Sequence, residues 1–189
     1  MLATGVKDEL PAVSGLAERW GKSIFHCPYC HGYELQAGPI GIIAASELAM
    51  HQAIMLPDWG TPTLFLNSAY TPSDDDLAAF ARRGTRVEST PIARIEGAAD
   101  VVLADGRTLS FNGLFTQPRT QLASPIAEQL GCALTQGPTG AFIQVDAMQQ
   151  TSVPHVFACG DAARAAGNVA MAVADGATAA ISAHRSTMV

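Results

Sequence analysis

The chain has 189 residues, 48% apolar and 15% charged, a composition typical of one globular domain or two small ones and not of disordered or coiled-coil proteins. The 11 Lys and Arg are outnumbered by 17 Asp and Glu, and the net charge of −6 argues against a nucleic-acid partner. No apolar run could cross a bilayer and the N-terminus lacks a secretory signal, so we expect a cytoplasmic protein with no membrane partner.

The first half of the chain alternates predicted strands and helices. A short helix over residues 16–20 precedes the segment Cys27-Pro-Tyr-Cys30-His-Gly. The elements that follow are a strand over 39–45, a helix over 47–56 with Ser46 as its N-cap, a strand over 61–67, and a helix that begins after Ser73 and ends before Gly84. This order predicts a βαβ unit.

From residue 86 on, short runs of alternating polarity predict a β-meander. The runs cover 86–90, 93–97, 101–104 and 108–111, with Asp105-Gly106 as a hairpin turn. The remaining predicted elements are strands over 113–116, 141–146 and 156–158 and helices over 124–130 and 168–184. Together the patterns predict an α/β fold.

The pair Cys27 and Cys30 is the sharpest chemical feature. Two intervening residues let the sulfurs reach bonding distance. The pair can therefore accept two electrons when the disulfide is reduced to a dithiol and give them up when the disulfide forms again. Half of a zinc site and two inert thiols are the alternatives. Because zinc needs two more ligands, and neither a second C-x-x-C nor an H-x-x-x-H is present, we favour redox chemistry and expect no metal.

Two residues after the pair could handle its protons. His31 directly follows Cys30, where an imidazole could take the proton of an attacking thiol, and Glu34 could orient it. The alternative is a surface histidine in a loop.

A second candidate site follows the segment 151–159. This segment ends in Gly160-Asp161, and a helix begins after Asn168. A carboxylate in this place can accept a hydrogen bond from a ribose or ribityl hydroxyl, and free N–H groups at a helix start suit an electron-rich ligand atom. Taken alone, Gly-Asp is a common turn.

These features together resemble the thioredoxin reductase family of FAD-dependent pyridine nucleotide-disulfide oxidoreductases. The features are the segment 27–34, the βαβ unit, the run T-S-V-P-x-V-F-A-x-G-D and the alanine-rich last helix. The dithiol oxidases of that family are the most similar, because their motif also reads C-x-x-C-H-G. The resemblance implies three-layer, Rossmann-like FAD- and NAD(P)-binding domains. Residues 6–113 would form the pyridine-nucleotide-like domain with the redox cysteines, and 1–5 with 114–189 the C-terminal part of the FAD domain.

The resemblance also implies roles for individual residues. Cys27 and Cys30 would form the redox disulfide beside the acid–base group His31. Residues that would bind FAD are Gly160, Asp161 at the ribityl chain, and Val169 and Ala170, whose backbone N–H groups would face the flavin. The implied function is an FAD-linked thiol/disulfide oxidoreductase acting on a small dithiol or a thioredoxin-like protein, with oxygen as a candidate acceptor.

Two departures from the family modify these expectations. The glycine-rich FAD segment that should precede Leu2 is not in the sequence, so we expect an incomplete FAD domain, an inactive isolated chain, and association with an FAD-binding half or a homo-oligomer. The turn Gly41-Ile-Ile-Ala-Ala-Ser46 has alanines where glycines are expected, and residues 67–70 offer no cation to a 2′-phosphate, so we expect no NADPH binding. A non-catalytic remnant or subunit that associates with another chain is the alternative function.

Overall fold

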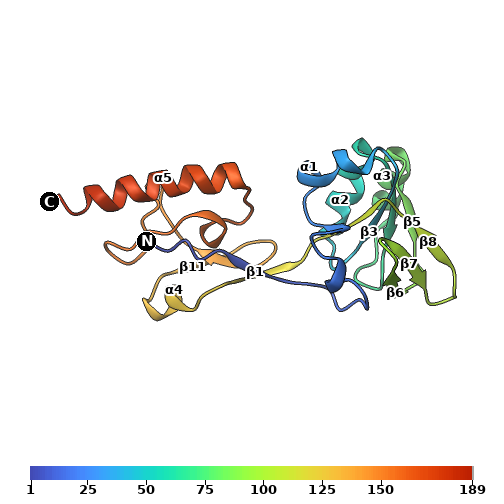
Figure 1. Ribbon diagram of the computed structural model, residues 1–189, viewed down its shortest axis with the longest axis horizontal. Coiled ribbons are helices and arrows are strands. Elements are labelled where there is room, and N and C mark those ends of the chain that lie inside the picture. The colour runs from blue at the N-terminus through green and yellow to red at the C-terminus, as the bar shows by residue number, and fades with distance from the viewer. Residues whose placement is uncertain (189) are drawn as a thin grey trace. The chain divides into compact units, whose positions relative to one another are not determined.

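The computed structural model describes residues 1–188, and the chain divides into two compact units (Figure 1). Leu10–Pro118 form one, here called the cysteine unit, and Met1–Glu9 with the chain from Arg119 on form the other, here called the terminal unit. The boundaries expected from the sequence, after residues 5 and 113, lie a few residues earlier than these.

A parallel sheet forms the centre of the cysteine unit. Its strands, in spatial order, are β2 (Ile24–Phe25), β9 (Gly113–Thr116), β3 (Pro39–Ile43), β4 (Thr61–Phe65) and β5 (Arg86–Glu88). Both faces of this sheet are covered, which explains why all residues of β3 and β4 except the first are buried.

Two helices cover one face of the sheet and an antiparallel sheet covers the other. The helices α2 (Ala49–Met55) and α3 (Asp74–Arg83) share an apolar cluster with Ile42 and Leu64. The meander consists of β6 (Ile92–Glu96), β7 (Asp100–Leu103) and β8 (Thr108–Ser110), and it packs on Ile43 and Phe65. The predicted α/β fold, with its βαβ unit and meander, is therefore confirmed.

The ends of α3 follow the sequence signals. The Ser73 hydroxyl accepts a hydrogen bond from the Asp76 N–H, and the Asp76 carboxylate accepts one from the Ser73 N–H, which is a capping box. Gly84, in the left-handed conformation, ends the helix. The prediction for α2 was wrong at its start: Leu48, not Ser46, is the N-cap, because the Ser46 hydroxyl accepts the Leu48 N–H in a turn before the helix.

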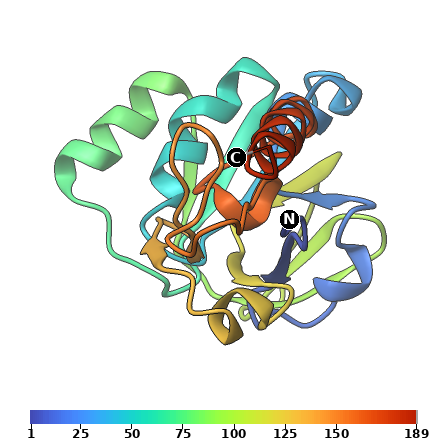
Figure 2. The same cartoon turned by 90° about the vertical axis from the view of Figure 1, so that its left-hand side faces the viewer.

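The terminal unit contains short paired strands and one long helix. Its elements are the antiparallel pair β1 (Val6–Glu9) and β10 (Arg119–Leu122), the antiparallel pair β11 (Leu134–Gln136) and β12 (Ala141–Ile143), α4 (Ile126–Gln129), the 3-10 turn η4 (Gly160–Ala163) and α5 (Val169–Arg185). The predicted strand over 156–158 is reduced to two isolated bridges, Gln150–Phe157 and Leu2–Ala158. Figure 2 views α5 nearly along its axis. None of the helices within residues 1–188 is both long and apolar enough to span a membrane.

Candidate functional site

The cysteine pair sits at the start of a one-turn helix, α1 (Pro28–His31). Cys27 is the N-cap residue, and Pro28 occupies the first helical position, where its missing N–H costs nothing. The turn brings the two free thiols together, with 2.8 Å between the sulfur atoms. Cys27 is half-buried and Cys30 is exposed, so Cys30 is the more accessible sulfur.

The Cys30 thiol donates a hydrogen bond to the Cys27 sulfur. This bond, then burial, then the charges of Cys27 and Glu34, raise the pKa of Cys30 to about 11. In the dithiol state Cys30 therefore retains its proton at neutral pH.

Contacts with α2 and the turn η3 (Leu56–Asp58) hold the redox loop, defined here as residues 26–35. The buried Gln52 side chain on α2 donates a hydrogen bond of 3.2 Å to the His26 carbonyl. Just after η3, Trp59 meets the Tyr29 ring edge to face, at a centroid distance of 5.1 Å. Gly32 approaches the Trp59 ring so closely that a Cβ at this position would overlap it. The loop is thus fixed to the helical layer.

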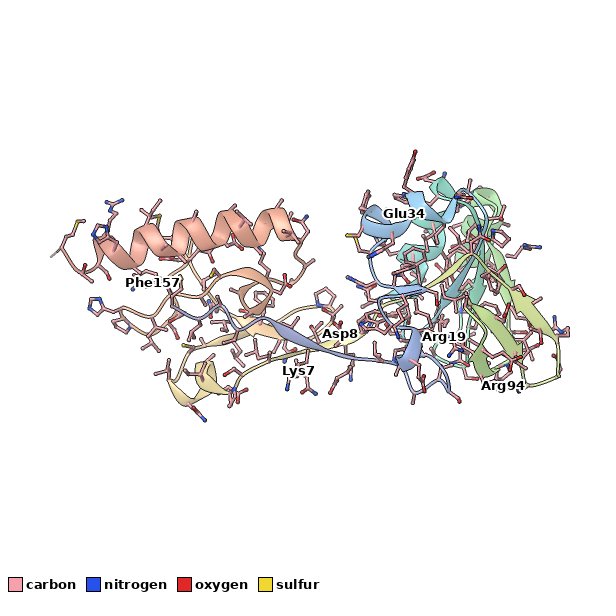
Figure 3. All side chains as sticks on the ribbon, viewed as in Figure 1. Lys7, Asp8, Arg19, Glu34, Arg94 and Phe157 are labelled. Atoms are coloured by element: carbon pink, nitrogen blue, oxygen red, sulfur yellow. The ribbon has the colours of Figure 1, made fainter. Side chains whose placement is uncertain are left out.

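The structure gives His31 and Glu34 separate surroundings. The exposed His31 ring stacks on Phe25 of β2, with centroids 4.2 Å apart and an interplanar angle of 11°. Glu34 lies on the turn η2 (Tyr33–Leu35), labelled in Figure 3. Within the described residues 1–188, no hydrogen bond or ion pair connects His31 with Glu34. Glu34 therefore does not orient the His31 ring as expected. Phe25 orients the ring instead, and Glu34 acts on Cys30 through its charge.

The second set of candidate residues lies in the terminal unit. Asp161, on η4, is exposed, and a Cβ on Gly167 would lie 2.5 Å from its Oδ1, so a larger residue there would require the carboxylate to move. At the start of α5 the Asn168 side chain accepts the Met171 N–H at 2.9 Å. The N–H groups of Val169 and Ala170 make no hydrogen bond within the described chain, and both residues are exposed.

A buried carboxylate that the sequence analysis missed fixes this turn. Asp175 on α5 is 4% exposed and pairs with both Nε and Nη2 of Arg164, the latter at 2.7 Å from Oδ1. It also accepts hydrogen bonds from Gln149 Nε2 at 3.3 Å and from the Gly160 backbone. The hydrogen bonds to Arg164 lower the pKa of Asp175. The signal that could have revealed it is that Asp175 is the only acid in the alanine-rich helix α5.

The carboxyl ends of β3 and β4 carry no cation. After β3, Ala44 is buried and Ala45 exposed, where the expected glycines would give a nucleotide access to the backbone. The Asn67 side chain accepts the Ile92 N–H at 3.1 Å and so belongs to the loop itself. Three aspartates form the first turn of α3 that follows. Within residues 1–188, no three His, Cys, Asp or Glu side chains gather as they would around a metal ion.

Comparison with known proteins gives one consistent family. The model of the pyridine nucleotide-disulphide oxidoreductase family matches residues 1–176. Thioredoxin reductase sirT of Leptosphaeria maculans is 34% identical over 95% of this chain and 60% of its own length. Thioredoxin reductase tcpT of Claviceps purpurea is 32% identical over 93% of this chain and 58% of its own length. The chain thus spans about 60% of the length of these curated relatives.

Solved structures show the same relationship. An oxidoreductase from Agrobacterium tumefaciens superposes with a TM-score of 0.96 at 57% identity, over 99% of this chain and 63% of that one. HlmI superposes with a TM-score of 0.88 at 32% identity, over 98% of this chain and 59% of that one.

Proposed function

Because the chain belongs to the pyridine nucleotide-disulphide oxidoreductase family and resembles its thioredoxin reductases, we propose that it is an FAD-linked thiol/disulfide oxidoreductase in which Cys27 and Cys30 cycle between dithiol and disulfide. The observation that carries this proposal is the approach of the two sulfurs to 2.8 Å on an exposed turn. Such a pair can close to a disulfide with a small movement of two side chains.

The proposed reaction starts from the Cys27–Cys30 disulfide. A substrate thiolate attacks the accessible Cys30 sulfur and displaces Cys27 as a thiolate. The second substrate thiol then attacks the mixed disulfide and displaces Cys30, which leaves an oxidised substrate and a reduced pair. His31, next to Cys30 in the chain, accepts the proton that each substrate thiol loses as it becomes the attacking thiolate and returns it to the sulfur that is displaced, first Cys27 and then Cys30.

FAD, when bound, supplies the two-electron acceptor that returns the pair to the disulfide. The residues of the terminal unit fit this cofactor: Asp161 offers a carboxylate to a ribityl hydroxyl, Gly167 leaves room for it, and the N–H groups of Val169 and Ala170 are free for an electron-rich atom. Gly160, the first residue of η4, has the left-handed backbone conformation that favours glycine. Oxygen, reduced to hydrogen peroxide, is the proposed final acceptor.

NADPH is not part of the proposal. The loop after β4 brings no Arg or Lys to a 2′-phosphate, and the three aspartates at the start of α3 would repel it. The proposed substrate is a small dithiol or a thioredoxin-like protein, which the names of the relatives support.

Redox titration tests the cysteine chemistry without any flavin. The chain is equilibrated in glutathione buffers of graded ratio, quenched, labelled with maleimide and weighed by mass spectrometry. We expect Cys27 and Cys30 to lose their labels together in one two-electron step, whereas Cys30→Ser should give only a mixed disulfide at Cys27. A Cys132→Ala variant is the matched control and should titrate like the wild type. Independent titration of Cys27 and Cys30 would refute the proposal.

Flavin binding is tested separately. Free FAD is added to the chain, and bound flavin is followed by its absorbance and by its bleaching with dithiothreitol under nitrogen. Because the sequence predicts an incomplete FAD domain, we expect weak binding and no sustained turnover; Asp161→Ala should weaken the binding further, and the single bleaching of bound flavin by dithiol should be lost in Cys30→Ser. Flavin that binds equally well to Asp161→Ala would remove Asp161 from the site.

A non-catalytic subunit is the second candidate function. Apolar side chains are exposed along α5, with Val169, Val173 and Ile181 at 82%, 68% and 58% exposure, and such surfaces favour association with another chain. A chain that neither cycles its cysteines nor binds FAD, yet forms a stable complex, would support this function over the enzyme.

A further inference from the structure

A cavity of about 340 Å³ opens in the cysteine unit and is lined by residues of the edge strand β5 and the meander strand β8. Its lining includes Pro39, Thr63, Arg86, Glu88, Leu109 and Phe111. None of the redox loop residues lines it. The volume lies within the range of small-molecule sites, which is about 300–1,000 Å³.

Strand register places Thr63 on the floor of this cavity. In the parallel sheet Thr63 lies between Gly41 of β3 and Arg86 of β5. Phe65, two residues further along β4, packs against the meander, so Thr63 faces the same side. Thr63 is 7% exposed, and its hydroxyl makes no hydrogen bond within residues 1–188. The cavity therefore holds a hydroxyl that makes no hydrogen bond to the described protein, on a residue that is otherwise mostly buried.

The two arginines at the cavity differ in their partners. Each nitrogen of the Arg107 guanidinium donates one hydrogen bond, Nη1 to Glu88 at 2.8 Å, Nε to Asp105 at 2.7 Å and Nη2 to Thr90 at 3.0 Å. Arg107 lowers the pKa of Glu88 to about 2, so Glu88 stays ionised at neutral pH, and Asp105 is a second carboxylate partner of Arg107. The Arg86 side chain, by contrast, has no hydrogen bond or ion pair within the described residues. Of the two arginines that line the cavity, only Arg86 therefore has a guanidinium that no carboxylate of the described residues pairs with.

The remaining wall is apolar. The Phe111 ring meets Phe65 edge to face at 5.6 Å and so is held in place, and Leu109 and Pro39 extend the apolar surface. A free guanidinium suits a carboxylate, which it can bind through two parallel hydrogen bonds, and the apolar wall suits a flat hydrocarbon body. We propose that this cavity binds a small organic carboxylate, with Arg86 and the Thr63 hydroxyl on the carboxylate and Phe111 against the apolar body.

Benzoate is the probe, titrated into the full chain and followed by amide chemical shifts, with benzamide as its neutral analogue. We expect saturable shifts confined to the lining residues and roughly tenfold weaker binding of benzamide. Arg86→Gln should weaken benzoate binding roughly tenfold and Thr63→Val, which keeps the side-chain shape, roughly threefold. Arg82→Gln, an exposed arginine of α3, should bind benzoate like the wild type.

Three results would overturn the proposal: no saturable binding, binding that Arg86→Gln leaves unchanged, or inorganic phosphate binding as tightly as benzoate, which would show that the apolar wall contributes nothing. Thermal unfolding of each variant confirms that the fold is intact. Because benzoate binding requires neither flavin nor cysteines, its failure would leave the proposed redox function untouched.

Discussion

The Cys30 thiol owes its raised pKa of about 11 first to the hydrogen bond that it donates to Cys27. Removing the acceptor should therefore return the Cys30 pKa towards its ordinary value. Since the thiolate is the reactive form, we predict that Cys27→Ala raises the rate of Cys30 alkylation by iodoacetamide at about pH 8.5 by roughly tenfold or more.

Peptide mass spectrometry against time gives that rate for Cys30 separately from the other cysteines. Cys132→Ala serves as control, because Cys132 is buried in the terminal unit and should leave the rate unchanged. Equal Cys30 rates in the wild type and Cys27→Ala would show that the hydrogen bond does not control the thiol.

At Asp175, pairing with Arg164 makes stability depend on pH. The hydrogen bonds to Arg164 lower the folded-state pKa, so the stabilisation is present above the unfolded carboxyl value of about 3.9 and is lost as the pH falls through the folded value. We predict that Asp175→Asn lowers the free energy of unfolding by roughly 1–3 kcal/mol at about pH 7 and by much less at about pH 3.

Urea unfolding of both proteins across this pH range measures the difference. Asp74→Asn is the matched control, since Asp74 is exposed in the first turn of α3 and should show only a small, surface-type effect. A deficit in Asp175→Asn that stays constant down to about pH 3 would contradict the ionic origin of the stabilisation.

Only part of the site could be predicted from the sequence. The C-x-x-C spacing of Cys27 and Cys30 lies within four consecutive residues, so it could be recognised without knowing the fold. Gln52 hydrogen-bonds to His26, 26 residues away, and Asp175 pairs with Arg164, 11 residues away. No local sequence pattern predicts such pairs. The expected contact of Glu34 with His31 is not formed for a related reason: the His31 ring stacks on Phe25 of β2, a partner that the local sequence does not indicate.

Among the elements, α3 and α5 begin and end close to the predicted residues because each carries its own cap, Ser73 and Asn168. The strand pair β1–β10 was not predicted. Its partners are more than a hundred positions apart, Val6 opposite Leu122, and β1 has mostly exposed side chains, so neither a turn nor an apolar alternation reveals it.

The position of the redox loop depends on its contact with Trp59, and Gly32 is the loop residue that lies closest to the Trp59 ring. A Cβ on Gly32 would overlap the Trp59 ring and lie 2.7 Å from the Pro28 carbonyl oxygen. We predict that Gly32→Ala displaces the loop, lowers the free energy of unfolding by roughly 1–3 kcal/mol, and speeds amide hydrogen exchange in residues 27–35.

Gly176→Ala is the matched control for this change. Gly176 lies within α5 with open space around its Cβ position, so alanine there should be neutral or stabilising by roughly 0.5–1 kcal/mol. Unaltered exchange in the loop of Gly32→Ala would mean that Trp59 does not hold it.

At the scale of the whole molecule, each unit has its own core. The two large apolar clusters, around Phe80 and around Phe65, consist entirely of residues between 10 and 118. The cluster around Ile143 and the smaller one at Phe157, labelled in Figure 3, consist entirely of residues of the terminal unit. The chain enters and leaves the cysteine unit at Leu10 and Pro118, so this unit is one continuous segment.

Because a continuous segment with its own core satisfies the requirements of an autonomous domain, we predict that residues 10–118 fold alone. The excised segment should unfold in one cooperative urea transition, and its Cys27–Cys30 pair should titrate in glutathione buffers as in the full chain, since Phe25, Gln52 and Trp59, which hold the redox loop, all remain. Phe80→Ala, which empties part of the helical-side core, should cost the same roughly 3–5 kcal/mol in the segment as in the full chain if the core is intact. A segment that lacks a cooperative transition, or whose cysteines titrate at a different potential, would show that the terminal unit contributes to the stability or to the redox chemistry of the cysteine unit.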